Sequence, residues 1–375
     1  MDIGTFIKQP QGYTAFVPKK FPPKNLPTLD EDLQSLHDRA FFSLGKLDGI
    51  TQVLPDLDFF IFMYVRKEAA YSAEIEGTMA TMADSIKVDA DVEGDIPKDV
   101  ENISKYIQAM NEGLGKLSDL PLSSRLIKEI HKTLMEGTED GKGKTPGRFR
   151  TSQNWIGGNS PDTAKFVPPP ADHIGDAMSD LEEFLHADDV TSPLVKTALA
   201  HAQFETIHPF LDGNGRVGRL LVTFYLCQLE LLDKPVLYLS AYLRKHREGY
   251  FDLINRYHND GDFVSWLRFF LRGIAEVSED AIKTARTIHE IRKEDLEKAE
   301  SLGRRADNAT TVLNKLYELP IVSVKKVESW TGLSRTTANE LVDVLVDIGI
   351  LEQQDKDKNY DRRFEYKRYL KAFSE

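Results

Sequence analysis

One twelve-residue stretch, HPFLDGNGRVGR at residues 208–219, concentrates side chains that can do chemistry. Gly213 and Gly215 let the backbone approach a ligand closely, and the apolar periodicity that follows them predicts a helix. Backbone N–H groups at a helix N-terminus bind anions. Arg216 and Arg219 lie three positions apart on one face of that helix, where each guanidinium group can grip a phosphate. The stretch therefore predicts a site for a phosphate-rich ligand.

Three more side chains of this stretch extend the prediction. Asp212 offers a carboxylate for a divalent cation, because Mg²⁺ favours a carboxylate together with phosphate oxygens. Asn214 offers both a hydrogen-bond donor and an acceptor inside the loop. His208, four positions before Asp212, can take a proton from an incoming hydroxyl group. Each feature alone is more often structural, and it is their joint occurrence that favours a functional site.

The stretch resembles the signature of the Fic family, H-P-F-x-D/E-G-N-G-R-x-x-R, with every fixed position matched. The resemblance implies a mainly α-helical protein with a Fic-type core, which transfers AMP from ATP, with Mg²⁺, to a hydroxyl side chain of a target protein. His208 would be the catalytic base and Asp212 the metal ligand. The residues that would bind the phosphates of ATP are Gly213, Asn214 and Gly215 (α and β), Arg216 (β) and Arg219 (γ).

Two further regions resemble parts of that family. The glycine- and proline-rich segment 137–170 predicts a long loop that carries a β-hairpin, and it resembles the Fic flap, which aligns the target beside the motif. Downstream, Tyr250 and Asn259 would line the adenine pocket, although a core tyrosine and a helix-capping asparagine explain these two residues equally well. The flap residues implied by the resemblance are Ile156, Gly157 and Gly158.

A second stretch, SAEIEG at residues 72–77, carries an acid on a predicted helix. Ser72 and Glu76 lie four positions apart, hence on one face, and Gly77 predicts the end of the helix. Alone, this pattern is typical of a solvated helix face. Together with the loop motif it resembles the Fic inhibitory motif, S/T-x-x-x-E-G/N. The resemblance implies that Glu76 pairs with Arg219, displaces the γ-phosphate and makes the protein self-inhibited, as in the class II arrangement.

The composition fits a globular protein. The chain has 375 residues, of which 41% are hydrophobic and 29% charged, enough for two or three domains. A formal net charge of −12 argues against broad binding to nucleic acid or to an anionic membrane. The single cysteine, Cys227, lies in an apolar run and is expected to be a buried reduced thiol. With no signal peptide and no apolar run long enough to cross a membrane, the expected location is the cytoplasm.

The pattern divides the chain into four parts. Residues 1–110 are predicted to form an extended arm and a helical region with the inhibitory motif, and residues 111–277 the Fic catalytic core. A linker helix at 278–305 leads to a winged helix-turn-helix domain at 306–375. That domain is predicted from two helices joined by a glycine-containing turn at 331–334 and from the hairpin pattern that follows.

Two alternatives remain open. The same site could remove AMP from a target, or transfer another phosphate-containing group. A different reading makes the protein a DNA-binding transcription regulator, in which the second helix of the C-terminal domain enters a major groove. The residues that could face the groove are Ser334, Arg335, Thr336, Thr337 and Asn339, and the acidic residues that weigh against this are Asp357, Asp361 and Glu365. Such domains also mediate dimerisation or protein docking.

Several properties stay undetermined at this level. The sequence names neither the target protein nor the modified side chain, which could be tyrosine, threonine or serine, and it leaves self-modification open. The resemblance alone leaves a homodimer open. Nothing in the sequence identifies the signal that relieves inhibition.

Overall fold

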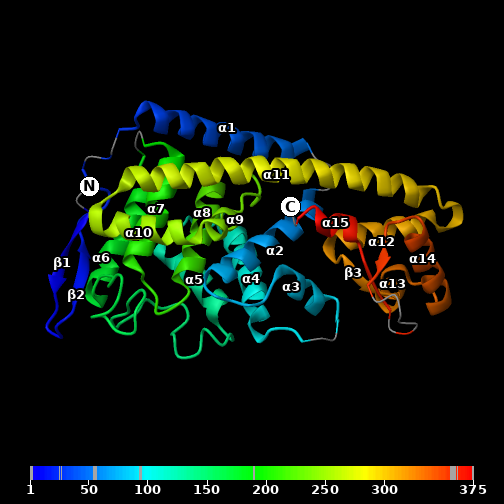
Figure 1. Cartoon of the computed structure of the whole chain (residues 1–375), viewed down its shortest axis with the longest axis horizontal. Helices are drawn as coiled ribbons and strands as arrows, with labels where there is room; N and C mark the ends of the chain where they lie inside the picture. Colours follow the sequence, from blue (N-terminus) through cyan, green and yellow to red (C-terminus); the bar gives the residue numbers. More distant parts are fainter. Residues whose placement is uncertain are drawn as a thin grey trace.

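The structure is a computed structural model that describes residues 3–24, 26, 28–53, 57–92, 95–188, 191–354, 360 and 362–373. It is mainly α-helical, with two small antiparallel sheets (Figure 1). The α-helices are α1 (Glu31–Val53), α2 (Leu57–Ile75), α3 (Met82–Asp89), α4 (Glu101–Lys116), α5 (Ser124–Met135), α6 (Ile174–His186), α7 (Pro193–Ile207), α8 (Asn214–Gln228), α9 (Ser240–Lys245), α10 (Arg247–Asp260), α11 (Phe263–Glu300), α12 (Ala306–Glu318), α13 (Val324–Thr331), α14 (Arg335–Asp347) and α15 (Lys367–Lys371). The strands are β1 (Gly4–Lys8), β2 (Thr14–Pro18), β3 (Ile321–Ser323), β4 (Glu352–Gln353) and β5 (Arg363–Glu365). None of these helices is long and apolar enough to span a membrane.

The long helix α11 runs along most of the molecule, with α1 beside it (Figure 1). Its first half packs on the helical bundle, where the Trp266 indole N–H donates to the carbonyl of Ala198 at 2.8 Å. Its second half extends to the C-terminal helices (Figure 1). The sequence pattern predicts that the catalytic core ends at residue 277 and a linker helix begins at residue 278, but α11 continues through both residues. The proposed domain boundary therefore falls inside one helix, and the division into domains stays a prediction.

Helices α7 and α8 form the centre of the bundle and carry the motif between them. Every residue of α7 from Leu194 to Ile207 is buried, so this helix is a core element with no solvated face. Pro193 occupies its first turn, where the missing N–H costs nothing. Because both flanking helices are buried, the loop that joins them is held on a rigid base.

Helix α2 carries most of the stretch SAEIEG, residues 72–77. The helix ends at Ile75, and Gly77 follows with a φ of 102°, a conformation that glycine adopts readily. The expected helix end is thus confirmed to within two residues. Glu76 lies in the turn directly after the helix, which lets its side chain extend beyond the helix surface.

The N-terminal arm and the predicted flap pack together. Strands β1 and β2 pair in antiparallel fashion, so the arm is a hairpin and not only an extended segment. The Phe16 backbone N–H donates to the carbonyl of Val167 at 2.9 Å, and the rings of Phe16 and Phe166 lie 5.7 Å apart. In the flap, however, the predicted hairpin reduces to one bridge, Ile156 with Phe166. Glycines and prolines on both sides of this bridge prevent a longer ladder.

The C-terminal elements follow the expected order of helix, strand, two helices and two strands. Gly332, with a φ of 70°, directly follows the last residue of α13, and the Ser334 hydroxyl caps α14 by accepting from the Thr337 N–H. The three strands pair in the order β3-β5-β4. Asp357 and Asp361, which were weighed against DNA binding, lie outside the described residues. The assignment as a winged helix-turn-helix domain stays a prediction.

Candidate active site

The motif loop closes through its own residues. His208 ends α7 in the left-handed conformation, with a φ of 48°, and Gly213 opens α8 with a φ of 76°. The buried Asn214 side chain accepts a hydrogen bond from the Phe210 N–H and donates one to the Phe210 carbonyl, both at 2.9 Å. These two bonds use the polar atoms of the Asn214 amide to hold the loop. Contact with phosphate is therefore left to its backbone N–H.

Arg150 ties the base of the flap to the motif loop. Its guanidinium donates to the carbonyls of His208 at 2.9 Å and Pro169 at 2.6 Å, and its backbone N–H donates to the Pro209 carbonyl at 2.9 Å. Burial lowers the pKa of Arg150 to about 10, so the side chain remains charged at neutral pH. Sequence reasoning missed this residue, because nothing in its spacing separates it from the exposed Arg148.

The His208 side chain is neutral at physiological pH. Burial, and then the nearby charge of Arg150, lower its pKa to about 4. Its Nδ1 is buried and has no hydrogen-bond partner among the described residues, and the nearest carboxylate oxygen, in Glu205, is 3.9 Å away. A neutral imidazole next to the loop can accept a proton.

The start of α8 presents closely packed cationic groups. The Arg216 guanidinium is buried and pairs with Asp140 at 3.0 Å, whereas its Nε and Nη1 have no hydrogen-bond partner among the described residues. A side chain at Gly213 would clash, since an added Cβ would lie 2.8 Å from the sulfur of Met135. Two buried, unsatisfied N–H donors beside a helix N-terminus suit an anionic ligand.

Asp212 lies at the edge of this group. Its carboxylate is 44% exposed, accepts from the Gly213 N–H at 2.6 Å and lies 3.9 Å from Arg216. The carbonyl of Asp212 accepts from His131 Nε2 at 3.1 Å. Within the described ranges, no group of three or more His, Cys, Asp or Glu side chains could hold a metal ion. A cation bound by Asp212 would therefore need further ligands from water or from a substrate.

Glu76 and Arg219 form an ion pair across the site. The Glu76 carboxylate accepts from Arg219 Nη2 at 2.8 Å, and Ser72 accepts two further bonds from the same guanidinium, at 2.8 Å to its hydroxyl and 2.9 Å to its carbonyl. Burial opposes ionisation of Glu76, but the charge of Arg219 outweighs it and holds the pKa of Glu76 below its usual value. The same carboxylate raises the pKa of Arg219 against its own burial. The two stretches identified in the sequence thus meet, although 143 positions separate these two residues.

Of the predicted flap residues, Gly157 and Gly158 are exposed and Ile156 is partly buried. The Ile156 N–H donates to the Phe166 carbonyl at 2.9 Å, and the ring of Phe166 lies 4.0 Å from that of His258. Gly157 and Gly158 follow with φ values of 68° and 72°. An added Cβ at Gly158 would lie 2.4 Å from the Thr163 carbonyl oxygen, so this tight turn requires glycine.

Comparisons with known proteins agree with this geometry. A family model described as the Fic/DOC family matches residues 121–226, and a second, the Fic/DOC family N-terminal region, matches residues 34–115. Together they span about half of the chain. This chain belongs to the Fic/DOC family.

Curated relatives of this Fic chain are modestly similar. A protein adenylyltransferase Fic of Drosophila virilis is 26% identical over 264 residues, which cover 67% of this chain and 49% of the relative. A probable protein adenylyltransferase of Aquifex aeolicus is 29% identical over 202 residues, which cover 52% of this chain and 58% of the relative. This chain thus spans about half the length of the curated relatives it matches.

Solved Fic structures share the fold. A Fic family protein from Desulfovibrio desulfuricans aligns with a TM-score of 0.59 at 21% identity, over 92% of this chain and 98% of that one. A Fic domain containing signaling protein from Bacteroides thetaiotaomicron aligns with a TM-score of 0.53 at 18% identity, over 68% of this chain and 97% of that one. At these identities the likeness shows the fold alone.

The two residues expected on the adenine side of the Fic site differ in environment. Tyr250 is buried, and its hydroxyl bonds His201 Nε2 at 3.1 Å. Because His201 Nδ1 donates to the Gly218 carbonyl at 2.9 Å, Nε2 is the acceptor in that bond. Burial lowers the pKa of His201 to about 4, in agreement with a neutral ring. Asn259 is exposed in the last turn of α10. The packing supports a core role for Tyr250, and a place for either residue in a base pocket stays a prediction.

Proposed function

We propose that this chain is a protein adenylyltransferase, which transfers AMP from ATP to a hydroxyl side chain of a target protein or of itself. The observation that carries the proposal is the motif loop, which holds a neutral imidazole beside a helix N-terminus and two buried arginine side chains. In the reaction, the hydroxyl oxygen attacks the α-phosphorus, the bond to the β-phosphate oxygen breaks and pyrophosphate leaves. His208 takes the proton of the hydroxyl group.

The donors around the loop fit the phosphates of ATP. The backbone N–H groups at the start of α8 and the two unpartnered donors of Arg216 supply positive potential where negative charge is transferred. We assign the α- and β-phosphates to Gly213, Asn214 and Gly215, the β-phosphate also to Arg216, and the γ-phosphate to Arg219. Asp212 would hold Mg²⁺, which when bound would neutralise part of the phosphate charge.

We further propose that the protein is self-inhibited by Glu76. The carboxylate binds the guanidinium that the γ-phosphate needs, and its negative charge repels the nucleotide. ATP must therefore break the Glu76–Arg219 pair before its phosphates can align. Ser72 supports this state, because its hydroxyl and carbonyl hold the guanidinium in the same orientation.

A transfer assay tests the proposal. Wild type, Glu76→Gly and the double variant Glu76→Gly with His208→Ala are incubated with α-labelled ATP, magnesium and a bacterial lysate. We expect much faster labelling of protein by the single variant than by wild type, no labelling by the double variant, and an increase in the intact mass of the modified protein by one AMP unit. Equal labelling by the double variant would refute the role of His208.

The reverse reaction uses the same groups and remains an alternative. Release of AMP from a previously modified target by wild type, without transfer by Glu76→Gly, would favour removal of AMP. Transfer of label from the α-phosphate of ATP to protein by Glu76→Gly would exclude removal of AMP as the main activity of that variant.

A second candidate function is DNA binding by the C-terminal elements. A groove at the start of α14 is lined by several basic side chains: Lys325, Lys326, Arg335, Arg362 and Arg363. Against this, Arg362 already bonds Asn339 at 2.8 Å and Asp343 at 3.0 Å. A gel shift with the full chain tests this function: specific binding must weaken as salt rises and must be lost in Lys325→Glu with Lys326→Glu.

A further inference from the structure

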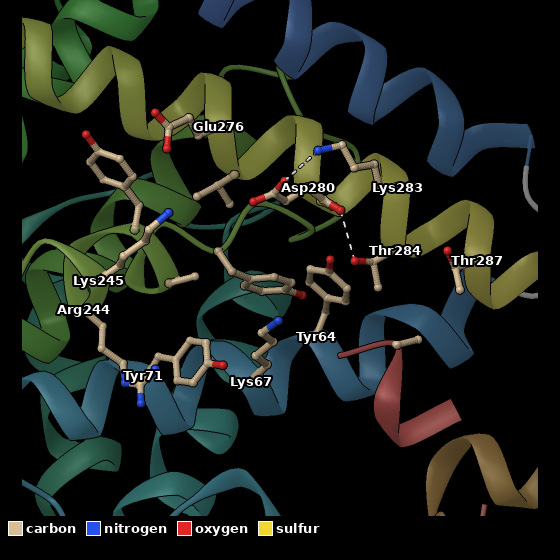
Figure 2. Close-up of a pocket in the computed structure, with 16 residues that line it drawn as sticks. Tyr64, Lys67, Tyr71, Arg244, Lys245, Glu276, Asp280, Lys283, Thr284 and Thr287 are labelled. Atoms are coloured by element: carbon tan, nitrogen blue, oxygen red, sulfur yellow. Dashed lines mark hydrogen bonds and ion pairs between the residues drawn. The ribbon is translucent and has the colours of Figure 1, made fainter. Parts of the chain in front are cut away.

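A cavity lies away from the motif loop, between α2, α9 and α11 (Figure 2). Its volume is about 570 Å³, within the range of roughly 300–1,000 Å³ that is typical of small-molecule sites. Side chains of the three helices line it, and Ala372 near the end of the chain closes one side. We call it the α2–α9–α11 cavity.

The walls of the α2–α9–α11 cavity are unusually aromatic. Four tyrosine side chains line it: Tyr64, Tyr71, Tyr238 and Tyr242. The rings of Tyr64 and Tyr238 lie 4.9 Å apart. The Tyr238 hydroxyl is buried, yet it has no hydrogen-bond partner among the described residues. A buried hydroxyl without a partner is unfavourable, so a ligand that bonds it would gain free energy.

The charged residues of the cavity are only partly neutralised. Lys67 extends from α2 into the cavity (Figure 2). Its ammonium donates one bond, at 2.7 Å, to the Phe373 carbonyl. Two of its three donors therefore remain for a ligand. Lys245 of α9 and Glu276 of α11 have no hydrogen-bond or ion-pair partner among the residues that the structure describes. Asp280 pairs with Lys283 at 3.2 Å.

The balance of these charges is positive. Among the described residues, Lys67 and Lys245 have no ion-pair partner, and Glu276 is the one carboxylate of the lining without one. Burial lowers the pKa of Lys67, and an anion beside it would offset that effect. A ligand with one anionic group and a ring therefore matches the cavity best. Its ring would lie against the tyrosines, and an N–H or O–H group of the ring would donate to Glu276.

We propose that the α2–α9–α11 cavity binds a small planar anion, a ring-bearing molecule with one phosphate or carboxylate group, and that its occupant stabilises the inhibited position of α2. Tyr64, Lys67 and Tyr71 of the lining lie on α2, the helix that also carries Ser72 and leads directly into Glu76. Tyr71 directly precedes Ser72, and Glu74, paired with Arg244, lies two positions before Glu76. The Arg244 guanidinium also lies 4.5 Å from the centre of the Tyr71 ring.

The sign of the coupling follows from the arrangement. The cavity is formed while Glu76 is paired with Arg219, so a ligand that fits the cavity shifts the population towards the inhibited state. By linkage, ATP at the motif loop must weaken the affinity of the cavity for its ligand by the same factor. This second half rests on the proposed inhibition by Glu76, whereas binding to the cavity does not.

Calorimetric titration of the full chain tests the binding half. Uridine 5′-monophosphate is the phosphate probe and indole-3-acetate the carboxylate probe, and we expect at least one to bind. Lys67→Met and Lys245→Met should each weaken binding about tenfold or more, because each removes a charge-assisted bond. Lys293→Met, at an exposed lysine elsewhere on α11, is the matched control and should change nothing. Failure of both probes to bind, or binding lost in Arg216→Ala but kept in Lys245→Met, overturns the site.

The transfer assay tests the coupling half. The bound probe should slow transfer by wild type and leave Glu76→Gly unaffected, because that variant has no inhibited pair to stabilise. Equal slowing of both proteins, or of neither, overturns the coupling. If the probe binds as expected but neither protein transfers AMP, the proposed function fails while the cavity site stands.

Discussion

Replacing Glu76 with glycine should strengthen the binding of ATP. A hydrogen bond between charged groups contributes about 1.5–3 kcal/mol. The Glu76 carboxylate is 37% exposed, so solvent screening reduces its pairing with Arg219 to about 1–2 kcal/mol. ATP no longer has to break this pair in the variant, and the Kd for ATP should fall about five- to thirty-fold. The loss of a negative charge next to the γ-phosphate acts in the same direction.

The measurement is the affinity for ATP with magnesium by titration calorimetry. Both proteins carry His208→Ala, so that no turnover occurs during the titration. Glu74→Gln is the matched control, because Glu74 lies on the same helix and pairs with Arg244 instead of Arg219. It should leave the Kd within about twofold of the parent. A Kd for Glu76→Gly as close to the parent as that of the control would refute the inhibitory role of the pair.

Three further changes test other parts of the structure. Arg150→Met should lower kcat at least about tenfold and destabilise the fold by about 2–4 kcal/mol, because buried carbonyls of the loop and flap lose their donor. Thermal unfolding measures the loss of stability. Arg148→Met, at an exposed arginine, is the control. The pKa of His208, lowered to about 4, predicts that kcat/KM stays level from neutral pH down to about pH 5. Below that, kcat/KM should fall as the pH drops through the pKa, because the base becomes protonated. A fall centred near pH 6.5 would show an unperturbed imidazole. Asp295→Asn should destabilise the docking of the C-terminal elements by about 3–5 kcal/mol, because this fully buried carboxylate accepts from Arg368, Lys298 and the Tyr366 hydroxyl. Unfolding in urea measures the loss of stability. The control is Glu294→Gln, which removes only an exposed partner of the same arginine.

Local features of the structure were predictable from the sequence because their causes are local. The motif loop lies within twelve consecutive residues, and its glycines, helix start and cationic face follow from neighbouring positions. Likewise, the turn between α13 and α14 follows from Gly332 and the capping Ser334. The element order of the C-terminal part could therefore be predicted without any knowledge of its packing.

Features that depend on distant contacts were not predictable in this way. Arg150 is a core residue only because the carbonyls of His208 and Pro169 surround it. No periodicity in the sequence predicts that this position is buried. The two halves of α11 differ in their apolar pattern because they pack on different neighbours, so the sequence suggests two segments where the chain forms one helix. The burial of Asp295 was also not predictable, because an acidic residue on a charged helix is ordinarily exposed, whereas Asp295 is fully buried.

The ion pair of Glu76 with Arg219 depends on both local spacing and a distant contact. Spacing places Ser72 and Glu76 on one helix face, but it cannot name a partner 143 positions away. The geometry supplies the reason: an added Cβ at Gly215 would lie 2.1 Å from the Glu76 carboxylate, so the acid occupies the space beside the first turn of α8. That space favours any anion, because the helix N-terminus and two arginines surround it. A carboxylate held there is favoured by the same electrostatic field that would bind phosphate, and an anion site of this kind can be inhibited by any acid of the chain that reaches it.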